Sequence, residues 1–183
     1  MSAEFTGDAQ PPSRLARWAA YASALSATVG FIPLHAAWAM GIPLWAHKDK
    51  FHQWYAQGGG PYLSVLSVMA LLAGVLALSL VRPWGQVFPG WVPLLAGRPV
   101  PRRTLAATAF IVAAFLLVYT GWAAWQTFGD FEDDGIFSPW IVVYGVPQFL
   151  VWGGGLLIAA YQYARRTAGG RPVVGGVLTG PLP

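Results

Sequence analysis

The sequence predicts an all-α membrane protein with four transmembrane helices. Four stretches, residues 18–46, 62–81, 104–128 and 136–164, contain no Asp, Glu, Lys or Arg. About 20 apolar residues cross the hydrocarbon core of a bilayer, so each stretch is long enough. Only 10% of the 183 residues are charged and 56% are hydrophobic. That composition leaves too little polar surface to cover a soluble globular domain.

These stretches and their flanks divide the chain into three parts. Residues 1–14 are polar and contain Pro11 and Pro12, which predicts a disordered tail. Residues 15–166 form the transmembrane domain, with spans of about 15–41, 62–82, 104–128 and 138–164 in an antiparallel bundle. Residues 167–183 are expected to be a flexible C-terminal tail.

The basic residues predict the orientation. Nine of the eleven Lys and Arg residues lie in the N-terminal flank, the connection between spans two and three, and the C-terminal flank. Five of the seven acidic residues lie in the other two loops. Because short cytoplasmic segments carry an excess of Lys and Arg, both termini are expected in the cytoplasm. Nine Arg against two Lys, with abundant Ala and Gly, also indicates a GC-rich bacterial genome, so the expected location is the bacterial plasma membrane.

Small residues at helical spacing predict close packing of the spans. They occur as Ala20, Ala24 and Thr28 in the first span, Ala70 and Gly74 in the second, Ala109 and Ala113 in the third, and Gly153, Gly154 and Gly155 in the fourth. Pro33 is expected to kink the outer half of the first span. The first outer loop, residues 42–61, ends in a glycine triplet at 58–60 that predicts a flexible hinge.

A weak internal similarity leaves two interpretations open. His35-Ala-Ala-Trp38 ends the first span much as Trp122-Ala-Ala-Trp125 ends the third. Two duplicated hairpins would form a parallel repeat, related by an axis along the membrane normal. Alternatively, the positive-inside rule by itself makes alternate spans look alike.

The middle connection, residues 83–103, is too rich in proline for a regular helix and too apolar for a water-exposed loop. We expect it in the cytoplasmic headgroup layer, with its aromatic rings inserted and its arginines at lipid phosphates. A simple tether between two spans is the alternative. The expected headgroup contacts are Trp84, Trp91, Arg98, Arg102 and Arg103.

Polar residues of the outer half define a second candidate site. His35 is the one Asp, Glu, Lys, Arg or His well within a span, away from the span ends, and a buried histidine is most often neutral and hydrogen-bonded to the protein. The functional alternative is an outward-facing polar cavity. Its expected members are His35, Ser64, Ser67, Tyr119, Thr120, Tyr144 and Gln148. Gln148 follows Pro147, so we expect its side chain to bond to another helix.

Several classes of function lack the residues that they need. The absence of cysteine excludes disulfides, thiolate nucleophiles and iron–sulfur clusters. His47, His52 and the outer-loop acids match no common zinc spacing, so no metal or other cofactor is expected. No contiguous basic surface remains for nucleic acid. We expect attraction between Lys48 or Lys50 and the outer-loop acids instead.

Two segments carry a resemblance to a known group. The segment from Gly30 to Gly41, GFIPLHAAWAMG, resembles the start of small four-helix integral membrane proteins of actinobacteria, and the segment from Pro89 to Arg103 is similar to their middle connection. The likeness covers about residues 16–166. It implies a four-helix fold and a membrane location, and because the group is largely of unknown function it implies no catalytic residue.

The sequence therefore favours a non-enzymatic structural, assembly or lipid-interacting protein whose partners are membrane lipids and either further copies of itself or another membrane protein. The alternative is a small oligomeric transporter or channel that uses the outer polar cluster. A membrane enzyme acting on a lipid is the third possibility, although no catalytic motif supports it.

Overall fold

The computed structural model describes residues 11–129, 131 and 133–168, and within these ranges it contains helices and no β-strand. Three helical runs are long and apolar enough to cross a membrane: Lys48–Ser79, Arg102–Gly129 and Trp140–Ala168. This confirms the all-α class, and it is consistent with a membrane protein. The expected tails lie largely outside the described residues.

The first helical run is continuous but irregular. It consists of α1 (Arg14–Leu25), the π-helical turn η1 (Ser26–Phe31) and α2 (Ile32–Ala39). The hydroxyl of Ser13 caps it by accepting a hydrogen bond from the N–H of Ala16 at 3.1 Å. Pro33 has no N–H to donate to the carbonyl of Val29. The π-helical turn ends at Phe31, two residues before this proline. This run is not among the three apolar ones, because its serines, Thr28 and His35 lower its mean hydropathy.

The segment expected to be an outer loop is largely helical. Helix α3 (Lys48–Trp54) continues through η2 (Tyr55–Gly59) into α4 (Gly60–Ser79). The corner between them depends on Gly58, whose φ of 105° favours glycine. A Cβ atom on Gly59 would lie 2.5 Å from the Trp54 ring, and one on Gly60 would lie 2.7 Å from the Tyr55 ring. Gly58 therefore turns the chain at this corner, whereas Gly59 and Gly60 pack against aromatic rings.

The second half of the chain is a long helical hairpin. After the short 3-10 helix η3 (Pro83–Gly85) and an irregular connection come α5 (Arg102–Gly129) and α6 (Trp140–Ala168). Helix α6 packs along α5 and also against α1. Pro147 lies inside α6, where it leaves the carbonyl of Val143 without its usual helical partner.

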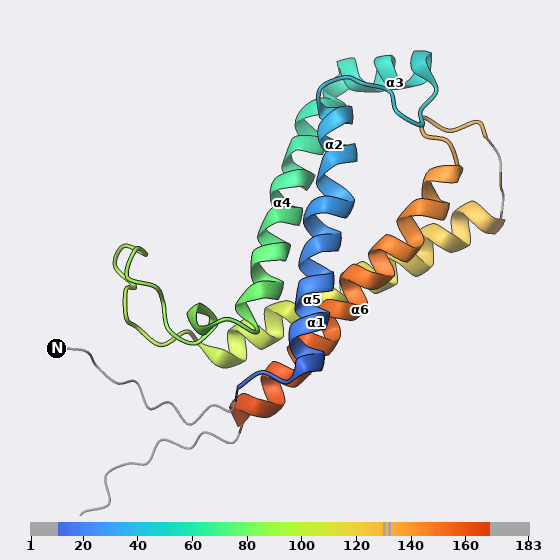
Figure 1. Cartoon of the computed structure of the whole chain (residues 1–183). Coiled ribbons are helices and arrows are strands. Elements are labelled where there is room, and N and C mark those ends of the chain that lie inside the picture. The colour runs from blue at the N-terminus through green and yellow to red at the C-terminus, as the bar shows by residue number, and fades with distance from the viewer. Residues whose placement is uncertain (1–10, 130, 132, 169–183) are drawn as a thin grey trace, which may run out of the picture.

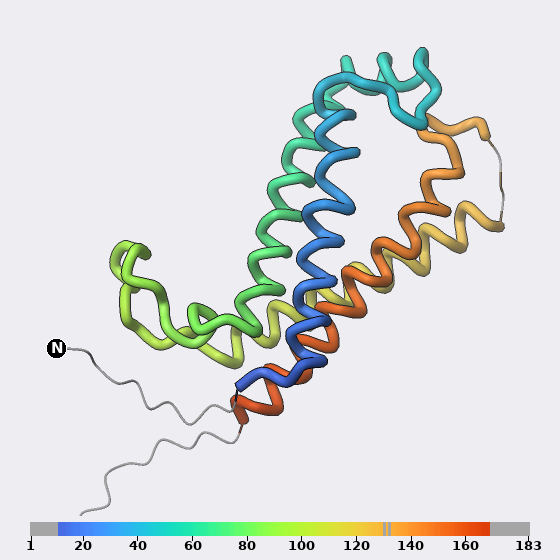
Figure 2. The backbone as a smooth tube through the Cα atoms, in the orientation of Figure 1, coloured from blue at the N-terminus to red at the C-terminus, as the bar shows by residue number. Residues whose placement is uncertain are grey.

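The two halves cross rather than lie side by side. Figure 1 shows that the first helical run and α4 stand at an angle to α5 and α6, and the tube in Figure 2 shows the same crossing. We call the end where α1 begins and α6 ends the basic end, and the end that carries α3 the acidic end. At the acidic end the two halves meet again through the isolated bridge between Ala46 and Phe137.

The core is largest near the basic end and is built mostly from alanine. Helices α1, α4, α5 and α6 all contribute to it, which lets their backbones approach closely. Its buried members are Ala16, Ala20, Ala24, Ala77, Leu80, Val81, Ala106, Ala109, Ala113, Leu156, Ala159, Ala160 and Tyr163. Outside this core, large apolar side chains on α4, α5 and α6 are exposed. Such surfaces suit lipid as the surrounding solvent.

Helix α6 fixes the connection that follows α4. The hydroxyl of Tyr163 donates a buried hydrogen bond to the carbonyl of Gly85 at 3.0 Å. The guanidinium of Arg166 donates to the carbonyl of Leu80 and lies over the Tyr163 ring, 5.2 Å from its centroid. The last turns of α6 thus satisfy one carbonyl at the end of α4 and one in η3.

The crossing of α1 and α6 generates a first prediction. A Cβ atom on Gly155 would lie 2.7 Å from the carbonyl oxygen of Ala19, whereas nothing lies within 4 Å of a Cβ atom on Gly154. Gly155→Ala should therefore lower the free energy of unfolding by about 1–3 kcal/mol, measured by SDS titration in mixed micelles. Gly154→Ala is the matched control and should be neutral or stabilising, because alanine is the better helix former. Equal effects of the two substitutions would contradict the close contact.

Candidate functional site

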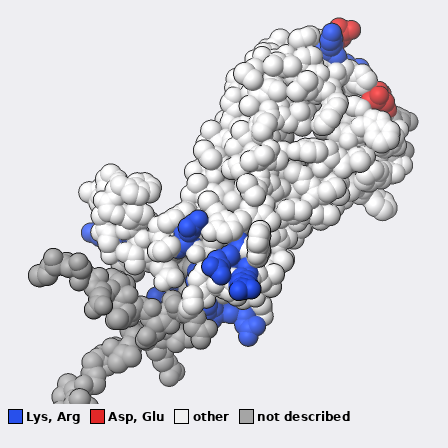
Figure 3. All heavy atoms as spheres, in the orientation of Figure 1, with Lys and Arg blue, Asp and Glu red and all other residues white. Residues whose placement is uncertain are grey.

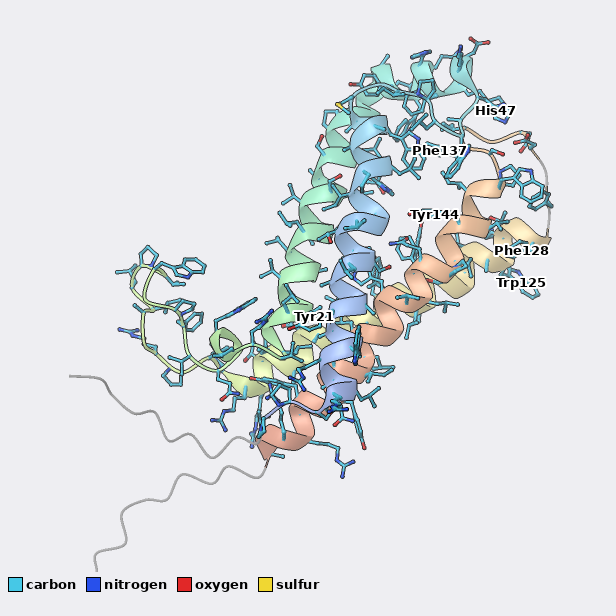
Figure 4. All side chains as sticks on the ribbon, in the orientation of Figure 1. Tyr21, His47, Trp125, Phe128, Phe137 and Tyr144 are labelled. Atoms are coloured by element: carbon cyan, nitrogen blue, oxygen red, sulfur yellow. The ribbon has the colours of Figure 1, made fainter. Side chains whose placement is uncertain are left out.

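Three hydrogen-bonded levels join the first helical run to α6. The Ser23 hydroxyl donates to the carbonyl of Trp152 at 2.9 Å. One level along, the Ser26 hydroxyl donates to the carbonyl of Gln148 at 2.6 Å, and the Gln148 side-chain amide donates back to the carbonyl of Ser26 at 2.9 Å. At the third level, the Tyr144 hydroxyl donates to the carbonyl of Gly30. Figure 4 shows Tyr144 directed from α6 toward the first helical run.

The π-helical turn explains why these contacts form here. Both acceptor carbonyls on the first run, those of Ser26 and Gly30, belong to η1, where the ordinary helical pattern is interrupted. A carbonyl oxygen can accept a second hydrogen bond, and because no water is present in lipid, a donor on a neighbouring helix is the group that can supply it. Gly30 also lets Gln148 approach, since a Cβ atom there would lie 3.1 Å from the Gln148 side chain.

An apolar groove runs beside these contacts. It is lined from the first run by Ala22, Leu25, Ser26, Val29 and Gly30, and from α6 by Val143, Tyr144, Pro147, Gln148 and Val151. Its volume is about 690 Å³, and it is open to the surroundings of the helices. The polar side chains in it already bond to the protein, so its surface offers mainly hydrocarbon.

The structure does not gather the seven expected cavity residues into one polar site. Of the seven, only Tyr144 and Gln148 donate a hydrogen bond to another helix. The three serine and threonine hydroxyls each donate to a backbone carbonyl of their own helix, one turn earlier: Ser64 to Gly60, Ser67 to Leu63 and Thr120 to Leu116. Tyr119 lies on α5 among the rings of Phe115, Trp122 and Phe149.

His35 is held by its own helix. Its Nδ1 lies 2.9 Å from the carbonyl oxygen of Phe31, and a carbonyl can only accept, so Nδ1 carries the proton. The imidazole stacks on the Phe31 ring with a centroid distance of 3.5 Å, and the Trp38 ring lies 4.9 Å away. His35 is therefore packed and hydrogen-bonded within its own helix, and its ring does not form a polar cavity with the other expected residues.

The middle connection contains a hydrogen-bonded loop that projects from the basic end. We call residues 86–100 the projecting loop. Its two sides are joined between Phe88 and Arg98 and between Gln86 and Val100, with N–H to oxygen distances of 2.9 and 2.8 Å. Its tip is apolar and fully open: Trp91 is 81% exposed and Leu94 is 91% exposed. In Figure 1 this loop extends away from the helices as the green coil between α4 and α5.

The other expected headgroup contacts lie around the base of the projecting loop. Trp84 is partly buried in η3, and Arg98 is exposed where the loop returns. Arg102 is partly buried and Arg103 is exposed in the first turn of α5. Five residues predicted to contact headgroups therefore lie on one connection, but only Trp91 extends to the apolar tip.

Charges separate along the length of the molecule. On the face drawn in Figure 3, basic side chains gather over the basic end, whereas the opposite end shows acidic side chains together with basic ones; both lysines of the chain, Lys48 and Lys50, lie there on α3. There, His47 Nε2 lies 2.9 Å from a carboxylate oxygen of Asp133, and the Lys50 ammonium donates to the backbone carbonyl of Asp134. Among the described residues no three potential metal ligands lie together; Asp130 and Glu132 lie outside them.

Comparison with known protein families, with characterised proteins and with solved structures gave no match to this chain.

Sequence reasoning missed several residues of this site. Ser23, Ser26 and Gly30 face α6, yet none of them was among the expected cavity residues. A signal existed, because Tyr144, Gln148 and Trp152 repeat every four residues and so share one helix face. Apart from the nearby Pro33, nothing in the sequence gives the position of the π-helical turn that supplies two of their acceptors.

The hydrogen-bonded contact generates a second prediction. Gln148→Leu should lower the free energy of unfolding by about 1 kcal/mol, because the carbonyl of Ser26 loses the hydrogen bond that it accepts from α6. Ser26→Ala should have an effect of similar size, because it removes the hydrogen bond to the carbonyl of Gln148. Ser67→Ala is the control, since its hydroxyl bonds only within α4. The free energies of unfolding of the three variants are measured by SDS titration. If Ser67→Ala lowers the free energy of unfolding as much as the other two, the hydrogen bonds between the helices do not contribute the predicted stability.

Proposed function

We propose that the chain is a four-pass protein of the bacterial plasma membrane that engages the anionic cytoplasmic leaflet through its projecting loop. Its role is non-enzymatic: it anchors or organises its membrane surroundings, through lipids and further copies of itself or another membrane protein. The single observation that carries the proposal is the fully exposed apolar tip at Trp91 and Leu94, on a loop beside the basic end.

The first helical run is the fourth span in this proposal. Its 26 residues from Arg14 to Ala39 would extend about 39 Å at 1.5 Å per residue, against a hydrocarbon core of about 30 Å. Leu25 and Val29 are exposed on its outward face, as expected where lipid surrounds a helix. Bacterial origin follows from the composition and from the resemblance to the actinobacterial four-helix proteins.

The orientation follows from charge. Arg14, Arg17, Arg82, Arg98, Arg102, Arg103, Arg165 and Arg166 all lie at the basic end or on the adjoining connection. Placing that end in the cytoplasm satisfies the positive-inside rule and puts both termini there. It also places the projecting loop at the cytoplasmic headgroups, where Trp91 and Leu94 can enter the bilayer while Arg98 remains at the phosphates.

The alternative of a transporter or channel receives less support. Such a function needs polar groups that face a common path, and the expected polar residues bond either to their own helices or to the η1 turn. A lipid-modifying enzyme would need an activated nucleophile, and the serines of α4 donate to backbone carbonyls instead.

The projecting loop generates a third prediction. The native chain has no cysteine, so Leu94→Cys can carry an environment-sensitive fluorophore in nanodiscs. Its emission should shift to the blue and be quenched by lipids with spin-labelled acyl chains, because the tip enters the bilayer. Adding Arg98→Gln should weaken the dependence on anionic lipid by about 1 kcal/mol.

The matched control is Gln53→Cys on α3, an exposed position at the acidic end, which should report water. A water-like spectrum at position 94 in both neutral and anionic nanodiscs would contradict the proposal. The same would follow if acyl-chain quenchers acted equally on positions 53 and 94.

A further inference from the structure

Two hollows lie end to end along the first helical run. The first, of about 380 Å³, is lined by Arg14, Arg17, Trp18 and Tyr21. The second is the apolar groove against α6, which begins one residue later at Ala22. Trp18, Ala22, Leu25 and Val29 follow one another at three- and four-residue spacing, so they form one stripe of the helix surface. A single elongated occupant could contact both hollows.

The first hollow is suited to a negative charge. Arg14 and Arg17 are exposed there, and the guanidinium carbon of Arg82 lies 5.5 Å from the centroid of the Tyr21 ring, which brings a third arginine from the end of α4. The described acidic residues all lie at the acidic end, Asp49 in α3 and Asp133 and Asp134 in the loop before α6. Guanidinium groups bind phosphate in paired hydrogen bonds, so a phosphate is the fitting head.

The second hollow is suited to hydrocarbon. Leu25 and Val29 face Val143, Pro147 and Val151 across it. The polar groups in its lining, those of Ser26, Tyr144 and Gln148, are already bonded between the helices. From Ala22 to Gly30 the groove extends about 12 Å along the helix, close to the roughly 15 Å depth of one leaflet.

We propose that this surface is a binding site for one anionic phospholipid. The phosphate lies between Arg14, Arg17 and Arg82 beside Tyr21, and one acyl chain occupies the groove between η1 and α6. The charge of the first hollow and the apolar lining of the second together match a molecule with an anionic head and a hydrocarbon tail. The residues differ from those of the projecting loop, so this proposal goes beyond the proposed function and can fail separately from it.

The test is native mass spectrometry of the full-length protein after delipidation and re-addition of phosphatidylglycerol or phosphatidylcholine. The wild type should retain one phosphatidylglycerol and much less phosphatidylcholine. The double variant Arg14→Gln/Arg17→Gln should lower the retained phosphatidylglycerol roughly tenfold or more, given the attraction per basic residue near an anionic head. Arg14→Lys/Arg17→Lys should retain most of it, because the charge is kept.

Three controls distinguish a specific binding site from general electrostatic attraction. Arg102→Gln/Arg103→Gln removes the same charge from the same end of the molecule, at candidate headgroup contacts outside this site, and should lower retention much less. Ala22→Phe fills the groove without changing charge and should lower retention, whereas Ala107→Phe, at an exposed position on α5, should not. Leu94→Ser/Arg98→Gln should also lower retention much less than Arg14→Gln/Arg17→Gln, which distinguishes this site from the projecting loop.

Three results would overturn the proposal: equal retention of the two lipids by the wild type, equal losses for the two arginine pairs, or full retention by Ala22→Phe. If the Arg14 and Arg17 variant does not fold, the lipid comparison on the wild type and the pair Ala22→Phe and Ala107→Phe decide the question.

Discussion

The contact between the first helical run and α6 is the interaction on which the rest of the structure depends. Within lipid, helices gain little from burying apolar side chains and must instead satisfy every backbone group and pack closely. Here Gly155 brings α6 against Ala19, and side chains from both helices satisfy carbonyls on the other. Without this contact, the halves formed by the first run with α4 and by α5 with α6 would share much less surface.

The same contact shapes the surface that lipid meets. Because the two halves cross near the basic end, their helices diverge from there and leave the groove between η1 and α6 open. The basic end also brings together the starts of α1 and α5 with the ends of α4 and α6, so arginines distant in sequence surround one end of the molecule. Packing thus produces both a charged end and a neighbouring apolar groove.

Part of this could be predicted from the sequence and part could not. Long uncharged stretches predict helices, and the all-α class was confirmed. The alanines at helical spacing indicated packing faces, and Ala24, Ala70, Ala109 and Ala113 are indeed buried. Local patterns could not reveal that the halves cross, because crossing depends on which small residues meet across helices far apart in the chain. The helix at Lys48–Trp54 was missed because its charged residues and the following glycines are typical of a loop.

The candidate site shows the same division. The sequence indicated that Gln148 would bond to another helix, and the structure supplies the partner, the carbonyl of Ser26. The choice of partner depends on the π-helical turn, which has no clear sequence signature beyond the nearby Pro33. The other expected cavity residues were grouped by depth alone, and depth does not determine which face of a helix a residue occupies.

The central claim is that lipid surrounds all four helical runs, including the less apolar first one. The most direct measurement is labelling of single cysteines, placed at Pro11, Lys48, Arg98 and Asp134, by a membrane-impermeant thiol reagent in right-side-out and inverted vesicles. The account predicts that positions 11 and 98 react from the cytoplasmic face and positions 48 and 134 from the opposite face. Reaction of positions 11 and 48 from the same face would show that the first run does not cross the membrane and would contradict the account.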